Sequence, residues 1–216
     1  MSNDVKVIEL PQSLTVRDLA EAMEASPIEV IKTLMANGVM ANINQLIDFD
    51  TAEIVAAELG IEAGPTPILL AALGPRMLRF AGGRLAGTTL GQCGPRTISS
   101  YILPHLQAGA ERAGRGDAPR IMALVRICVT DDFAGAKALA REIAAQYQSN
   151  PSYANATEHE GLDDASDLHL IGSWKQVLDG LAEYAEAGAT DLRIQIAAHD
   201  ETSRERTRDA LADYLS

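Results

Sequence analysis

Hydrophobic positions follow different patterns on the two sides of the segment Gly64-Pro65-Thr66-Pro67. Before it, apolar residues recur at helical spacing in short stretches that begin at cap residues, which is typical of a small helical domain. After it, short apolar runs alternate with amphipathic stretches, as strands and helices do when they follow one another. The sequence therefore predicts two domains, at 1–62 and 67–216, joined by a linker at 63–66.

Helix starts in the first domain are marked by capping sequences. Thr15 and Asp18 have the spacing of a capping box, and Ser26-Pro27-Ile28-Glu29 combines a cap residue with a first-turn proline and glutamate. Asp50-Thr51-Ala52-Glu53 predicts a third start, and residues 5–10 predict a short strand before the helices. A small helical core is predicted from the apolar residues at helical spacing, which are Leu19, Met23, Ile28, Ile31, Leu34 and Met35.

Four apolar runs in the second domain have the length of buried strands. These runs are Ile68–Leu73, Thr88–Leu90, Arg120–Thr130 and Asp191–Ala198. Amphipathic stretches follow them, with Asp131 as the expected cap after the third run and a capping box at Ser173-Trp174-Lys175-Gln176. Residues 154–168 are polar and predict a surface excursion. Such alternation predicts an α/β fold with parallel strands and right-handed crossovers.

Acidic residues dominate the first domain. Residues 1–62 contain eleven acidic and three basic residues, a net charge of −8 out of −12 for the whole chain. Since nucleic-acid affinity depends on cations that contact phosphates, we expect no direct, nonspecific nucleic-acid binding. The hydrophobic fraction of 47% supports folded cores, yet no apolar run reaches the ~18 residues of a membrane span. The N-terminus lacks a basic segment followed by an apolar one, so the expected location is the cytoplasm.

The two cysteines do not form a metal-binding or redox motif. Cys93 and Cys128 are far apart in the sequence and lie in or beside predicted strands, so buried thiols are expected. The sequence contains neither a CxxC nor an HExxH motif, and its four histidines are scattered. No metal site is therefore predicted.

The first domain resembles the N-terminal domain of bacterial translation initiation factor two. The likeness rests on LTVRDLA, SPIEVIKTLMANG and the ending DFDTAEIVAAELG, and it covers residues 5–62. In that family the domain precedes the GTPase and helps to dock the factor on the small ribosomal subunit, so the resemblance implies that subunit as a partner. The phosphate-loop motif GxxxxGK[ST] does not occur in this sequence, so GTPase activity is not expected.

The second domain resembles the C-terminal half of the luciferase-like monooxygenases, the flavin- or F420-dependent TIM barrels. The likeness rests on AALGPRMLRFAG, GTTLGQCGPRT, VRICVTDD and LIGSWKQVLDGLAEYAEAGATD. It implies half of a (β/α)8 barrel, comprising strands five to eight, with coenzyme F420 or FMN as the cofactor. In that family many contacts to the flavin ring come from strands one to four, so weak or absent activity is implied. The two edge strands of such a half-barrel would be unpaired, which suggests a homodimer.

Two loops are candidates for cofactor binding. Ala71, Ala72, Leu73 and Gly74 follow the first apolar run and open a helix, so backbone amides can approach an anion there. The resemblance implies that this loop contacts the phosphate side of the cofactor; a tight turn without a ligand is the alternative. Gly91 and Gln92 belong to the next loop on the same face, where barrels bind their ligands.

Three further residues are candidates for catalysis or substrate binding. His199 follows the last apolar run, beside Asp200, and is the candidate catalytic residue, with an ordinary surface histidine as the alternative. Arg126 and Arg193 lie inside predicted strands, where a charge must be paired or must face a polar interior. Both arginines are therefore candidates for binding a substrate.

Three functions remain open at this point. The first is a half-barrel derived from an F420- or FMN-dependent oxidoreductase, which binds cofactor phosphate at its strand ends and is weakly active or inactive alone. The second is a ribosome-binding module related to translation initiation, without GTPase activity. The third is a fusion of two domains with no activity of its own. The sequence does not decide whether the protein is an enzyme, and it does not name a substrate.

Overall fold

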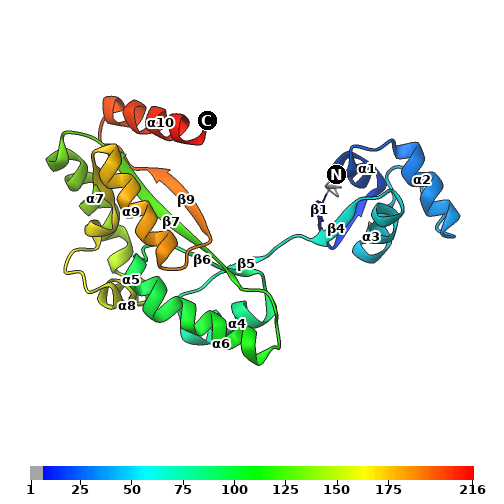
Figure 1. Cartoon of the computed structure of the whole chain (residues 1–216), viewed down its shortest axis with the longest axis horizontal. Helices are drawn as coiled ribbons and strands as arrows, with labels where there is room; N and C mark the ends of the chain where they lie inside the picture. Colours follow the sequence, from blue (N-terminus) through cyan, green and yellow to red (C-terminus); the bar gives the residue numbers. More distant parts are fainter. Residues whose placement is uncertain (1–6) are drawn as a thin grey trace, which may run out of the picture. The chain divides into compact units, whose positions relative to one another are not determined.

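The computed structural model describes residues 7–216, and the chain divides into two compact units (Figure 1). The units are Met1–Pro67 and Ile68–Ser216, each with a hydrophobic core of its own. Within the described part of the chain, no helix is both long and apolar enough to cross a membrane.

The first unit combines three helices with two small sheets. Its elements are β1 (Val7–Leu10), β2 (Ser13–Thr15), α1 (Val16–Met23), α2 (Pro27–Ala36), β3 (Leu46–Asp48), α3 (Phe49–Glu58) and β4 (Glu62–Pro65). β2 and β3 pair antiparallel, and β1 pairs in parallel with β4. The sequence predicts a linker at 63–66, but β4 occupies most of that segment and belongs to the first unit. Positions 5 and 6 of the predicted first strand lie outside the described residues.

Two of the three predicted helix starts in this unit are corrected in detail. Thr15 and Asp18 form the expected capping box, with each backbone N–H 3.2 Å from the other residue's side-chain oxygen. Ser26 precedes α2, but its side chain makes no capping hydrogen bond. α3 is capped by Asp48, which accepts from the N–H of Thr51 at 2.9 Å, and not by Asp50. Asp48 has the extended backbone that a cap requires, because it ends β3.

The core of the first unit contains only part of the predicted apolar stripe. Leu19 and Leu34 are fully buried, but Ile28 and Met35 are 65% and 51% exposed. α2 buries Val30 and Leu34, which are four residues apart and therefore lie on one face of the helix. The prediction that Ile28 and Met35 belong to the core is wrong, because their side chains do not lie on the buried face of α2.

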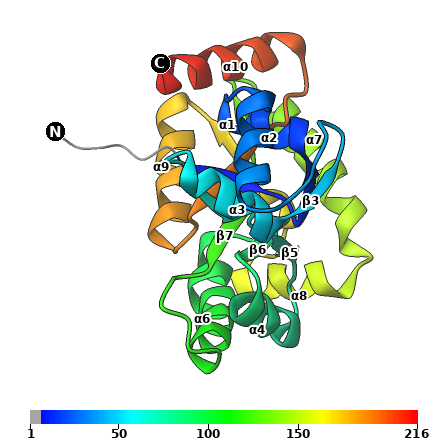
Figure 2. The ribbon, with the colours of Figure 1, turned by 90° about the vertical axis from the view of Figure 1, so that its right-hand side faces the viewer.

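The second unit is a mixed α/β structure. Its elements are β5 (Leu69–Ala71), α4 (Pro75–Arg84), β6 (Gly87–Leu90), α5 (Pro95–Thr97), the π-helical turn η1 (Ile98–Ile102), α6 (Leu103–Arg112), β7 (Arg120–Val129), α7 (Phe133–Gln148), α8 (Pro151–Glu160), the 3-10 turn η2 (Ala165–Leu168), β8 (Leu170–Gly172), α9 (Trp174–Glu186), β9 (Asp191–Ile196) and α10 (Glu201–Leu215). α4 and α6 lie side by side, as the two views of the chain in Figure 1 and Figure 2 show.

All strands of the second unit join one parallel sheet of five strands. The order β5-β6-β7 is extended by β8 and β9, which both pair with β7. Ile127 is paired with Leu170 of β8 and with Ile196 of β9, so these two strands flank β7 on opposite sides. The sequence predicts four strands and misses β8, a strand of three residues that follows the polar segment 154–168.

Helices cover the two faces of this sheet unequally. Every second residue of β7 from Ile121 to Val129 belongs to the main core, together with residues of α4, η1, α6 and α9. On the other face, Cys128 packs with Ala136 of α7, whereas Arg193 and Gln195 of β9 are exposed. α7 therefore covers the second face near the carboxyl ends of the strands, and this face is exposed closer to their amino ends, at Arg193 and Gln195.

Local signals between the strands are partly confirmed. Ser173 and Gln176 form the expected capping box of α9. α7 is capped by Asp132, whose carboxylate accepts from the N–H of Gly135 at 3.0 Å, and not by Asp131. The predicted surface segment at 154–168 is largely helical, since it contains most of α8 and all of η2, and most of its residues are exposed or half-buried.

Candidate functional site

Four residues of the two candidate loops line one cavity at the carboxyl ends of β5 and β6. They are Ala71, Ala72, Leu73 and Gly91, and the cavity has a volume of about 200 Å³. The rest of the lining comes from β6 and from the start of α8, and consists of Thr89, Asn150, Ser152 and Tyr153. The structure therefore brings the two loops together at one edge of the sheet.

Two glycines at this edge are not required by the fold. Gly74 lines an adjacent cavity of about 90 Å³, which it shares with Leu73. Its φ of −84° suits any residue, and a Cβ placed there meets no atom within 4 Å. A Cβ on Gly91 would lie 3.8 Å from the Tyr153 ring, which is an ordinary contact. Gly74 precedes α4 as its N-cap, a position that favours glycine, and both glycines also leave room for a ligand to approach the backbone.

The start of α4 supplies free backbone donors beside Gly74. Gly74 is the N-cap and Pro75 the first helical residue, and no side chain caps this end of the helix. The N–H of Leu78 donates to the carbonyl of Gly74, so the N–H groups of Arg76 and Met77 precede the first helical hydrogen bond. Such N–H groups, with the helix dipole, favour an anion. Backbone amides are thus the groups that could hold a phosphate here.

α8 lies over both loops and was not predicted from the sequence. Its residues line the 200 Å³ and 90 Å³ cavities as well as a third cavity of about 340 Å³. The signals for this helix are present: Asn150 caps it, Pro151 is its first residue, and Gly161 ends it with a φ of 75°. These are the signals that marked other helices, so they could have revealed α8 despite its polar composition.

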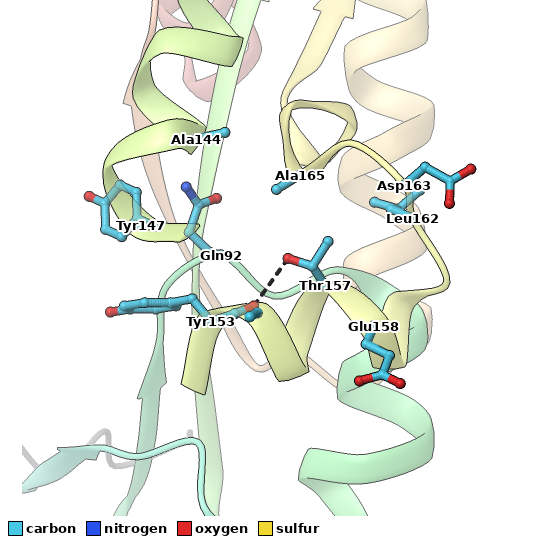
Figure 3. Close-up of a pocket in the computed structure, with 10 residues that line it drawn as sticks. Gln92, Ala144, Tyr147, Tyr153, Thr157, Glu158, Leu162, Asp163 and Ala165 are labelled. Carbon is cyan, nitrogen blue, oxygen red and sulfur yellow. Dashed lines mark hydrogen bonds between the residues drawn. The ribbon is translucent and has the colours of Figure 1, made fainter. Parts of the chain in front are cut away.

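Gln92 lies in the third cavity in an unusual state (Figure 3). Its backbone is left-handed, with a φ of 53°, which costs a non-glycine residue on the order of 1 kcal/mol. The residue is 4% exposed, and its Nε2 has no hydrogen-bond partner among the described residues. The loop after β6 thus holds a buried amide donor that the chain itself does not satisfy.

Arg126 contacts Tyr147, one of the residues that line the same cavity. It is 5% exposed and donates from Nη2 to the hydroxyl of Tyr147 at 2.9 Å, while its guanidinium carbon lies 5.2 Å from the centre of that ring. Its Nε has no partner among the described residues. Tyr147 lines the cavity and Arg126 does not, so Arg126 would act on a ligand there only through Tyr147.

The other two candidates lie apart from these cavities. Arg193 is exposed on the open part of the sheet face and does not line the three cavities. His199 places its Nε2 3.0 Å from a carboxylate oxygen of Asp132 and 2.8 Å from one of Asp200. Asp132 caps α7 and Asp200 caps α10, so the His199 ring connects the N-termini of these two helices through its contacts with both carboxylates. Its Nδ1 is buried without a partner among the described residues.

The helix start after β6 is already occupied by a carboxylate of the chain. Glu160 of α8 accepts from the N–H of Arg96 at 3.1 Å, from the N–H of Thr97 at 2.7 Å and from the Thr97 hydroxyl at 2.7 Å. A Cβ on Gly94 would lie 2.3 Å from the Glu160 carboxyl carbon, so a larger residue here would displace this carboxylate from the helix start. This helix start is therefore closed to an external anion.

The thiols and the acidic groups offer no further chemistry at this edge. Burial, with a smaller contribution from Glu160, raises the pKa of the Cys93 thiol to about 12, so it stays protonated and unreactive. Within residues 7–216, no group of three or more His, Cys, Asp or Glu side chains is placed to hold a metal ion.

Part of the chain is similar to a translation factor. Translation initiation factor IF-2 of Dehalococcoides mccartyi (strain CBDB1) is 54% identical over 59 residues, which are 27% of this chain and 10% of that protein. The same factor of Alkaliphilus oremlandii (strain OhILAs) is 48% identical over 64 residues, which are 30% of this chain and 9% of that protein. The chain thus spans about a tenth of the length of these curated relatives.

The larger part is similar to an enzyme structure and to a family model. An F420-dependent secondary alcohol dehydrogenase, solved with an F420–acetone adduct, gives a TM-score of 0.54 at 16% identity, over 66% of this chain and 47% of that chain. At this identity the likeness shows the fold, a mixed α/β structure with a parallel sheet. The model for luciferase-like monooxygenases matches residues 28–191, which is most of the chain. The protein therefore belongs to the luciferase-like monooxygenase family.

Proposed function

We propose that this chain joins two parts of different origin, with residues 1–62 as one domain and 67–216 as the other. The larger part is half of a (β/α)8 barrel from an F420- or FMN-dependent oxidoreductase. It binds the phosphate side of the cofactor at Ala71–Gly74 and Gly91. Membership of the luciferase-like family supports the cofactor class, and the similar enzyme structure is F420-dependent.

One observation carries this proposal. Gly74 and Gly91 lie beside neighbouring cavities at the strand ends, although neither backbone conformation nor packing requires a glycine at either position. The uncapped start of α4 adds backbone donors at the same place. A phosphate held by backbone amides needs this combination of missing side chains and free N–H groups.

The test is the substitution Gly74→Val. A Cβ at this position meets no atom within 4 Å, but valine is a poorer N-cap than glycine, so the melting temperature should fall slightly and the protein should stay folded. Binding of F420 or FMN, followed by absorbance titration and thermal shift, should weaken about tenfold or more because the side chain occupies the space of the phosphate. Gly116→Val is the matched control, since a Cβ there also meets no atom within 4 Å and the residue lies outside the cavities. Unchanged binding by Gly74→Val would place the phosphate elsewhere.

Slow or absent turnover follows from the same proposal. Hydride transfer requires the cofactor ring to be held about 3–3.5 Å from the substrate. The sheet face that would surround the ring is open at Arg193 and Gln195, and His199 is engaged by two carboxylates. Reduction of either cofactor on the order of 1 s⁻¹ or faster would contradict this expectation. Alanine substitution of His199 would then be the next experiment.

A homodimer is the proposed assembly. Among the described strands, β5 pairs only with β6 and β9 pairs only with β7, so each leaves one edge unpaired. Free edges of this kind are prone to pair with a second chain. Light scattering of the purified chain should give twice the mass of one copy. A monomer at tens of micromolar would refute this assembly.

A second function is favoured by the likeness of the first unit to initiation factor IF-2. We propose that residues 5–62 bind the small ribosomal subunit. Cosedimentation of the whole chain with purified small subunits tests this, and a chain lacking residues 1–62 is the control. Equal cosedimentation of both chains, or of neither, would remove this function.

A further inference from the structure

The 340 Å³ cavity has the size and composition of a small-molecule site. It is a partly open cavity bounded by the loop after β6, the end of α7, α8 and the segment before η2 (Figure 3). Ala144, Leu162 and Ala165 make much of the wall apolar. Ala71–Gly74 and Gly91, the residues proposed to bind phosphate, do not line this cavity, and Tyr153 is the wall residue that it shares with the 200 Å³ cavity.

A single unsatisfied donor identifies the polar anchor of the cavity. Gln92 lines the cavity and is only 4% exposed. Its Nε2 has no acceptor among the described residues. Buried N–H groups are almost always paired, because leaving one without an acceptor is unfavourable. A molecule in the cavity that carries an acceptor would satisfy this donor.

Two tyrosines shape one side of the cavity. The rings of Tyr147 and Tyr153 are 5.2 Å apart and nearly perpendicular. Arg126 donates from Nη2 to the hydroxyl of Tyr147 at 2.9 Å, which restrains the position of that ring. A rigid aromatic wall next to a single donor favours a ligand that is itself a ring with one acceptor.

The charges around the cavity decide the charge of its ligand. Glu158 and Asp163 line the side opposite the tyrosines, and both are exposed (Figure 3). No lysine, arginine or histidine is among the lining residues. An anion would be repelled by the two carboxylates, and no lining cation offsets them, because Arg126 reaches the cavity only through the Tyr147 hydroxyl to which its Nη2 donates. The acceptor on the ligand is therefore a neutral group such as a carbonyl.

We propose that this cavity binds a small, uncharged ring compound whose carbonyl oxygen accepts a hydrogen bond from Nε2 of Gln92. The site is distinct from the phosphate site, with Tyr153 as a common wall residue, and it does not depend on cofactor binding.

The test uses nicotinamide, a neutral ring with a carbonyl, and nicotinate, the same ring with a carboxylate. Binding to the whole ¹⁵N-labelled chain is followed in ¹H–¹⁵N spectra, where the side-chain NH₂ signal of Gln92 is assigned by its absence in Gln92→Met. Nicotinamide should shift this signal in a saturable way. Nicotinate should bind about tenfold more weakly or worse, because the carboxylates repel it. Glu158→Gln should reduce this difference and leave nicotinamide binding unchanged.

Gln92→Met removes the donor and keeps the length of the side chain. Its melting temperature should equal or exceed that of the wild type, because an unpaired buried donor is lost, while nicotinamide binding should weaken about tenfold. Ala154→Trp fills the cavity from an exposed position and should abolish binding without altering Gln92. Gly74→Val should leave nicotinamide binding intact, which separates this site from the phosphate site.

Three results would each overturn the proposal. The first is that nicotinamide shifts no signal of the cavity residues up to its solubility limit. The second is that Gln92→Met or Ala154→Trp binds it as the wild type does. The third is that nicotinate binds as tightly as nicotinamide, because the cavity would then not select a neutral ligand.

Discussion

Buried polar side chains in this protein fall into two groups, those with hydrogen-bond partners and those without. Thr97 is fully buried, and both its hydroxyl and its backbone N–H donate to the Glu160 carboxylate. The ring nitrogen Nε2 of His169 and the Nε of Arg126 are buried without partners among the described residues. Of the unpaired groups, only Gln92 Nε2 belongs to a residue that lines one of the three cavities, whereas His199 lies apart from them. An unpaired buried group therefore points to a binding site only where the same residue also lines a cavity.

His169 gives this unit a pH-dependent stability. Burial, with repulsion from Arg126 and Lys137, lowers the pKa of His169 from 6.5 to about 4. Because the folded state binds the proton less readily than the unfolded state, this contribution to stability is complete above pH ~6.5 and is lost as the pH falls towards 4. Urea unfolding should show a larger loss between pH 7 and pH 4.5 for the wild type than for His169→Gln. An equal loss in both proteins would contradict the assignment.

Helices in this protein are specified by short signals, but a signal acts only where the side chain reaches its target. Thr15 and Ser173 accept from the N–H three residues on, and each is part of a capping box. Ser26 has a stronger cap sequence and makes no such bond. α2 instead relies on Pro27 at its first position and on the buried row of Val30 and Leu34. The presence of a cap sequence is therefore weaker evidence than the geometry of the cap.

The caps of α1 and α2 make a matched pair for measurement. Thr15→Ala should destabilise the first unit by about 1 kcal/mol, because the capping box is lost. Ser26→Ala should cost only a few tenths of a kcal/mol, because no capping bond is broken. Urea unfolding followed by circular dichroism measures both. An equal loss of stability in the two variants would mean that Ser26 caps α2 in solution.

The described residues form three hydrophobic clusters, and none of them contains residues of both units. One core holds residues of the first unit only, and the other two clusters hold residues of the second unit only. Each unit has its own sheets and its own buried helix faces. Such an arrangement permits each unit to fold without the other, which is also what a chain of two origins requires.

Independent folding of the first unit is the prediction at this scale. A fragment of residues 1–67 should unfold cooperatively on heating, because its core and its β1–β4 pairing are complete. A fragment of residues 1–61 lacks β4 and should unfold at a lower temperature. A fragment 1–67 without a cooperative transition would show that its stability depends on the second unit.

Local features of both units could be predicted from the sequence alone. The two capping boxes, the strand-helix alternation and the loop Ala71–Gly74 depend on residues within about four positions of one another, and each is present. The two-domain organisation also follows from local pattern, since the period of the apolar residues changes along the chain. What these signals fix is the kind of element and the place where it begins.

Tertiary structure alone decided how distant residues meet. The Glu160 carboxylate lies on Thr97 although the two are 63 residues apart, and α8 covers loops that follow β5 and β6. Which side chains of α2 are buried and which donor stays unpaired at Gln92 also depend on packing between elements. The physical reason is that caps and periodicity act over one helical turn, whereas burial and the pairing of polar groups depend on neighbours that the order of residues does not specify.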